Sequence, residues 1–200
     1  MVMTEPSIPD WINAIAAATG ALAIVAGLFG AKNSIEESRN TARELRKSEV
    51  AEELIAIAFN VEDALKDIRN PFSSIPQEKL KDNRYPYQRR YERIVIYNEL
   101  FRSLRDAQIR VRAVVNDPKV DEAVEVLFSA RSSVAVAVEI LADYADDHST
   151  ELSDDEKNHM KSLKKDMYGS FSKRDELGSE ITSAIACIEE RLGPVARLNS

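Results

Sequence analysis

The sequence has few of the residues that build disulfide frameworks and tight turns. It contains one cysteine and six glycines among 200 residues. The single cysteine, Cys187, excludes an internal disulfide and is typical of a reducing compartment. Three of the six glycines lie at Gly20, Gly27 and Gly30, so few remain for the turns of an all-β fold. The composition, 30% charged and 6% aromatic, instead indicates a helix-rich protein.

Charged residues are missing from one long stretch of the chain. No Asp, Glu, Lys or Arg occurs from Trp11 to Ala31, and no Lys or Arg precedes Lys32. At ~1.5 Å rise per residue, about 21 helical residues span roughly 31 Å, close to the ~30 Å hydrocarbon core of a bilayer. A secretory signal peptide would need basic residues before the apolar run. The sequence therefore predicts a short extracytoplasmic tail at residues 1–10 and a transmembrane helix at residues 11–31.

The flanking charges predict how this helix is oriented. Basic residues follow it, beginning with Lys32 and Arg39, whereas the preceding tail carries only Glu5 and Asp10 as charged side chains. The positive-inside rule then places the N-terminus outside and the bulk of the chain in the cytoplasm. The competing interpretation is a buried helix of a soluble bundle, but such a helix normally keeps a polar face.

Small residues form a stripe along the predicted span. Steps of four and three residues place one set on a single helix face: Ala16, Gly20, Ala23, Gly27 and Gly30. In lipid, helices associate through the close packing that small residues permit. We therefore predict a homo-oligomer that associates through this face. The alternative is that Ala and Gly are simply common in membrane spans.

The remainder of the chain shows helical patterns only. Neither Pro nor Gly occurs between residues 32 and 70, and apolar residues recur at steps of four and three from Val50 to Ile68. These features predict a helical, coiled-coil-like stalk at residues 32–49, and Pro71 should end the helix that follows it. Later helices are expected at residues 87–115, at 118–146 behind an Asp117 cap, at about 154–167 behind a Ser153–Glu156 capping box, and from about 177 to Gly193-Pro194.

The predicted fold is therefore all-α. An N-terminal transmembrane helix continues into a long stalk helix, which leads to a four- to five-helix antiparallel bundle at residues 50–195. Membrane lipid is one expected partner, and the bundle offers a surface to a cytoplasmic protein.

Arginine is concentrated in one segment, with eight between Arg84 and Arg112. Interleaved tyrosines make RNA or anionic lipid conceivable ligands. The arginines do not share one helix face, however, and acidic residues on other helices favour intramolecular pairing. The cluster near a loop stays a candidate for contact with a partner or with lipid: Arg84, Arg89, Arg90 and Arg93.

Arg131 falls within the apolar seam of the helix predicted at residues 118–146. A buried arginine requires compensation of its charge, so we predict a buried ion pair. The alternative is an arginine that recognises a ligand.

Signatures of catalysis, cofactor binding and metal binding are absent from the sequence. There is no Gly-x-Ser-x-Gly, no phosphate-binding glycine loop and no His-Glu-x-x-His, and the acidic tract at residues 143–159 lacks EF-hand spacing. HEPN ribonucleases place an Arg a few residues before a His, a spacing that neither His148 nor His159 has. We expect no enzymatic activity, no cofactor and no metal site. The net charge of -7 argues against nucleic-acid partners.

Several blocks resemble a group of uncharacterised bacterial proteins with an N-terminal span and a helical cytoplasmic part. The blocks are "DWINAIAA", "AEELIAIAFNVEDALKDIRNPFS", "RYERIVIYNELFRSLRDAQIRVRAV" and "IEERLGPV". The recurring turn of that group matches Ile68, Arg69, Asn70 and Pro71, and its recurring helix matches Arg90, Tyr91, Glu92, Glu99, Leu100 and Phe101. The resemblance implies a single-pass protein of the bacterial inner membrane and implies no particular activity.

Three functions are compatible with these features. The first is a non-enzymatic, membrane-anchored, self-associating protein that presents a cytoplasmic bundle to protein partners. The second is a bacterial defence or toxin effector whose span oligomerises and permeabilises the inner membrane. The third is an RNA-binding, HEPN-like bundle without a nuclease motif.

Overall fold

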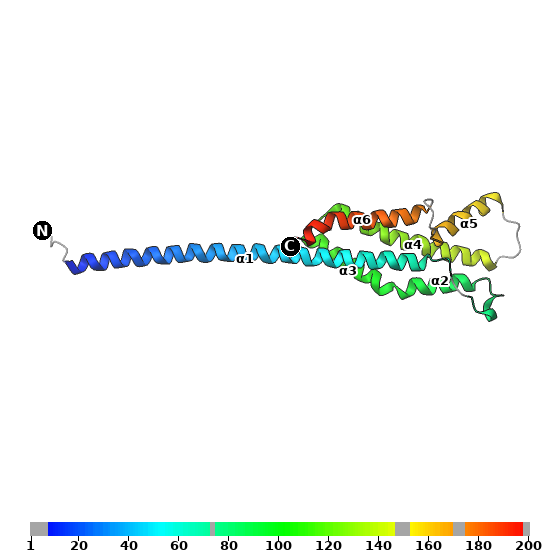
Figure 1. The fold of residues 1–200 in the computed structure, drawn as a ribbon, viewed down its shortest axis with the longest axis horizontal. Helices are drawn as coiled ribbons and strands as arrows, with labels where there is room; N and C mark the ends of the chain where they lie inside the picture. The colour runs from blue at the N-terminus through cyan, green and yellow to red at the C-terminus, as the bar shows by residue number, and fades with distance from the viewer. Residues whose placement is uncertain (1–7, 73–74, 147–152, 170–174, 198–200) are drawn as a thin grey trace. The chain divides into compact units, whose positions relative to one another are not determined.

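The computed structural model describes residues 8–72, 75–146, 153–169 and 175–197, without the side chains of residues 8–31, Asn33 and Asp146. Within these residues the chain forms six α-helices, one short 3-10 helix and no strand (Figure 1). The α-helices are α1 (Ile8–Ile68), α2 (Tyr85–Ile96), α3 (Asn98–Val114), α4 (Pro118–Asp146), α5 (Asp154–Met167) and α6 (Glu176–Ala196), and the 3-10 helix is η1 (Gln77–Lys79). The predicted all-α class is confirmed.

The predicted membrane span lies outside the described side chains. Residues 11–31 have helical backbone as part of α1, but the stripe from Ala16 to Gly30 has no described side chains. Among the described residues, no helix combines the length and apolarity that crossing a membrane requires. The span and its packing face therefore stay predictions.

The chain divides into two compact units, Met1–Leu45 and Arg46–Ser200. In the first unit the described side chains are exposed, apart from a half-buried Glu44. Lys32 and Glu36 form an ion pair one turn apart, at 3.9 Å. Ile35 and Leu45 are 57% and 48% exposed, so the described residues of this unit leave both apolar side chains largely open to solvent.

The second unit is organised around α4, which packs against α2, α3, α5 and α6. One apolar cluster joins α1 residues from Val50 to Leu65 with α3, α6 and the first half of α4. A second cluster joins Ile68 with α2, α5 and the second half of α4. Figure 1 shows α2 and α5 at the same end of this unit. The bundle is thus two apolar cores that share α4.

Local signals in the sequence place several helix ends correctly. The Asp117 carboxylate accepts the Lys119 N–H at 2.9 Å just before α4. Ser153 and Glu156 form both halves of the capping box that starts α5. The apolar seam of α1 is buried at Val50, Leu54, Val61, Ala64 and Ile68, as its spacing predicts, and half-buried at Ile57.

The helix predicted at residues 87–115 is wrong in one respect, because the chain turns at Tyr97 and forms α2 and α3. Tyr97 has φ −89° and ψ 9°, outside the α-helical range. Its ring packs against both apolar cores, and its hydroxyl donates to Asp67 Oδ2 at 3.1 Å. Because of this turn, α2 packs in the second apolar core and α3 packs in the first.

The predicted end of the last helix at Gly193-Pro194 is also wrong. Helix α6 continues to Ala196 with Pro194 inside it. A proline in the final turn removes only one backbone hydrogen bond. The Arg197 N–H donates to Gly193 O at 3.1 Å and closes that turn.

Candidate functional site

Helices α1 and α5 end close to one another, and their last carbonyls need hydrogen-bond donors. Arg90, on α2, supplies them. Its Nη1 donates to Ile68 O at 2.7 Å and to Met167 O at 3.1 Å, and its Nη2 donates to Asn70 O at 2.9 Å. One guanidinium therefore caps the C-terminal ends of two helices.

Arg69 makes a second set of bonds at the same place. Its Nε donates to Asp166 O at 2.9 Å and its Nη2 to Lys165 O at 3.2 Å, both in the last turn of α5. Nη2 also pairs with Asp175 Oδ1 at 2.6 Å. The carbonyl of Arg69 accepts the Gly169 N–H at 2.8 Å.

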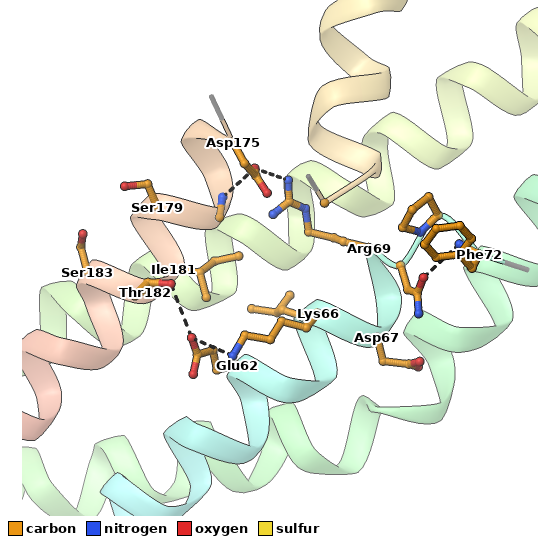
Figure 2. Close-up of a pocket in the computed structure, with 15 residues that line it drawn as sticks. Glu62, Lys66, Asp67, Arg69, Phe72, Asp175, Ser179, Ile181, Thr182 and Ser183 are labelled. Atoms are coloured by element: carbon orange, nitrogen blue, oxygen red, sulfur yellow. Dashed lines mark hydrogen bonds and ion pairs between the residues drawn. The ribbon is translucent and has the colours of Figure 1, made fainter. Parts of the chain in front are cut away.

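Asp175 links this pair to the start of α6. Figure 2 shows its carboxylate between the Arg69 guanidinium and the first turn of that helix. Oδ1 accepts the Gly178 N–H at 2.9 Å, so the same atom is an N-cap and half of an ion pair. A Cβ at Gly178 would lie 2.5 Å from Asp175 Oδ2, so a larger residue at this position would displace the capping carboxylate. We call Arg69, Arg90, Asp175 and the carbonyls they bind the arginine junction.

The arginine junction is buried and holds more positive than negative side chains. Arg69 and Arg90 are 3% and 4% exposed. Among the described residues, the two guanidiniums hydrogen-bond to a single carboxylate, Asp175. Helix C-termini carry partial negative charge, which offsets the second cation, and Arg90 also lies 4.5 Å from the centre of the Tyr168 ring. Burial lowers the pKa of Arg90 below its ordinary value, but an arginine stays charged at neutral pH.

A groove of about 930 Å³ lies beside the junction, between the end of α1 and the first half of α6. We call it the α1–α6 groove (Figure 2). Its lining includes the buried Leu65 and Ile181 and the exposed Phe72. Glu62 pairs with Lys66 one turn along α1 at 3.1 Å and accepts the hydroxyl of Thr182 on α6 at 3.5 Å.

The structure separates the four arginines that the sequence groups together. Arg84 pairs with Asp143 at 3.3 Å, and Arg89 pairs with Glu92 one turn along α2 at 2.7 Å. Both arginines are exposed and stay candidates for partner or lipid contact.

The other two arginines of that group turn towards the protein. Arg93 is half-buried, with Nη1 donating to Asp67 O at 3.3 Å. For Arg90 the prediction of a partner or lipid contact is wrong. It lies one turn before the buried Ile94, so its side chain enters the core.

Arg131 does not form the predicted ion pair with any described residue. Its guanidinium is half-buried, 4.6 Å from the centre of the Phe101 ring, and donates from Nη2 to Asn98 Oδ1. Burial lowers its pKa. The negative face of an aromatic ring here takes the place of the expected carboxylate.

The sequence contains signals for the residues of the arginine junction. Arg69 directly follows the last apolar residue of the α1 seam and precedes Asn70-Pro71, and Asp175 stands three residues before Gly178 at the start of an apolar helical pattern. Arg90 keeps the four-residue spacing to Ile94 that marks the inner face of α2. The chemistry of these groups is hydrogen bonding and charge compensation.

Comparisons with known proteins add no functional assignment. The chain matches no family model, no curated protein and no solved structure. The resemblance to bacterial single-pass membrane proteins stays a prediction. The described part of the chain also contains no group of three or more His, Cys, Asp or Glu side chains that could hold a metal ion.

Proposed function

We propose that this is a non-enzymatic, membrane-anchored helical protein that self-associates through its N-terminal span and presents its bundle to a protein partner in the cytoplasm. The observation that carries the proposal is the uncharged stretch from Trp11 to Ala31, whose backbone is helical throughout. Such a stretch has the length and composition of a bilayer span, and its helical backbone satisfies its own polar groups, as lipid requires.

The arginine junction supports the part of the proposal that concerns presentation. It ties the ends of α1 and α5 and the start of α6 to buried side chains. Surfaces next to such a network keep their shape, because opening it would leave buried charges and carbonyls without partners. A protein that offers a fixed surface to a partner needs this property.

Alkaline extraction of membranes followed by ultracentrifugation tests the anchor. We expect the full-length chain to stay with the membrane until detergent is added. A chain that moves into the aqueous fraction would refute the anchor.

Native mass measurement in detergent tests self-association. The double variant Gly20→Leu/Gly27→Leu fills the small-residue face and should yield monomers. The control Ala18→Leu/Ala21→Leu adds bulk to the opposite face and should keep the wild-type mass. Equal masses for both double variants would refute association through the stripe.

The second candidate is an effector that permeabilises the membrane. The stripe of small residues favours it too, because tight packing of spans is what a ring of helices requires. Overexpression with a membrane-potential dye distinguishes the candidates. Depolarisation that Gly20→Leu/Gly27→Leu abolishes would favour the effector, and an unchanged potential would favour the anchored protein.

A further inference from the structure

The α1–α6 groove has one exposed aromatic side chain in its lining, and a second one lies outside the lining on α1. Its lining includes Leu65 and Ile181, which are 0% and 4% exposed, and Phe72, which is 77% exposed. Phe59 lies about one turn before Glu62 on α1 and is 40% exposed. Exposed aromatic rings of this kind are enriched where proteins bind partners.

Charge around the groove is unevenly distributed among the described residues. Three carboxylates line it, Glu62, Asp67 and Asp175, against the cations Lys66 and Arg69. A fourth carboxylate, Asp63, lies 3.7 Å from Lys66 and is itself 79% exposed.

Both cations of the groove are already engaged. Arg69 is buried and bonded to Asp175, and Lys66 lies between Glu62 and Asp63. Their partners Glu62 and Asp175 are engaged as well, so Asp67 is the lining carboxylate that forms no ion pair with a described residue. The excess charge that the groove offers to a partner is therefore a single negative charge.

We propose that the α1–α6 groove binds an amphipathic helix of a protein partner that carries Lys or Arg beside its apolar side chains. The inference rests on the proposed function, because it specifies the partner to which the bundle is presented. A channel between two packed helices has the shape that a third helix fills. Apolar side chains of the partner contact Phe72, while its cations meet Asp63 and Asp67.

Hydroxyl groups along α6 complete the fit. Ser179, Thr182 and Ser183 line the groove, and hydroxyls donate or accept as the partner requires. A docked helix therefore finds apolar contact at Phe72 and polar contact along α6.

The test uses the full-length protein in nanodiscs of neutral lipid, with empty nanodiscs as the blank. The probe is a fluorescein-labelled synthetic helix of Leu and Lys, about 18 residues long so that it folds alone. Its counterpart has Glu in place of Lys. Fluorescence anisotropy should show saturable binding of the Lys peptide that weakens with salt, and no binding of the Glu peptide.

Matched variants locate the binding. Phe72→Ala should weaken the Lys peptide about tenfold, as truncation of an interface anchor does, whereas Leu80→Ala removes a side chain that is 66% exposed elsewhere in the same connection and should change nothing. Asp63→Asn should weaken binding more than Glu122→Gln, which removes the same charge from the start of α4.

Three outcomes would overturn the proposal. The first is equal binding of the Lys and Glu peptides, and the second is equal loss in Phe72→Ala and Leu80→Ala. The third is a change of subunit count in Phe72→Ala, which would assign the groove to contacts between copies. Alkaline extraction tests the membrane anchor in a separate experiment. A failure of peptide binding can therefore be distinguished from a failure of anchoring.

Discussion

Replacement of Asp175 by asparagine tests the arginine junction most directly, because it removes one charge and preserves the shape of the side chain. The amide oxygen can still accept the Gly178 N–H, so the cap of α6 survives. What is lost is the carboxylate 2.6 Å from Arg69, in a pair whose side chains are 12% and 4% exposed. The guanidinium then stays buried beside neutral acceptors.

The expected cost follows from this burial. Breaking a buried pair by removing one partner costs ~3–5 kcal/mol. Arg69 retains the carbonyls of Lys165 and Asp166, at a helix C-terminus that favours a cation, so we expect the lower value, about 3 kcal/mol. At ~2–4 °C per kcal/mol for a unit of this size, the melting temperature should fall by roughly 6–12 °C.

Thermal unfolding of the full-length protein in mild detergent, followed by far-ultraviolet circular dichroism, measures this shift. Glu99→Gln is the control, because it breaks a pair with Arg102 whose side chains are 77% and 69% exposed, and it should cost less than ~1 kcal/mol. Asp175→Ala should cost about 1 kcal/mol more than Asp175→Asn, since it also removes the cap. If Asp175→Asn melts like Glu99→Gln, the buried pair contributes no net stability and the reasoning fails.

Three further predictions concern single positions. Gly178→Ala puts a methyl group 2.5 Å from the carboxylate that caps α6. This variant should lower the free energy of unfolding in urea by ~1–2 kcal/mol. The control Gly193→Ala has 3.7 Å to its nearest neighbour and should not lower the free energy of unfolding. Asn116 has φ 57°, so Asn116→Gly should raise stability by about 0.5 kcal/mol, and a loss would show that the asparagine side chain contributes there. The Arg105 guanidinium holds the pKa of the Glu125 carboxyl below its ordinary value. The stability that the Arg105–Glu125 pair contributes is therefore present at neutral pH and is lost as pH falls through that lowered pKa. Arg105→Gln should flatten the acid side of a plot of urea midpoint against pH.

Much of the fold follows from local rules. The seam from Val50 to Ile68 predicts a helix whose inner face is buried, because helical spacing puts these residues on one side. The starts of α4 and α5 follow from Asp117 and Ser153, whose side chains bond to backbone groups within one turn. Such features need no knowledge of distant residues.

The turn at Tyr97 and the burial of the Arg90 side chain depend on residues that are distant in the sequence. No proline or glycine marks residue 97, and the turn arises because α2 and α3 serve different cores. The buried guanidinium of Arg90 donates to carbonyls that lie 20 to 77 residues away in the sequence. For the same reason a charge pattern alone did not single out Asp175, whose partner is 106 residues away.

That separation has a consequence for synthesis of the chain. Arg69 leaves the ribosome 106 residues before Asp175, which at ~5–20 residues per second is a delay of roughly 5–20 s. During this interval the nascent first helix carries an arginine whose final acceptors do not yet exist. A messenger or protein shortened ahead of Asp175 would leave it without its counter-ion for good, so we expect such fragments to be substrates for quality-control proteases.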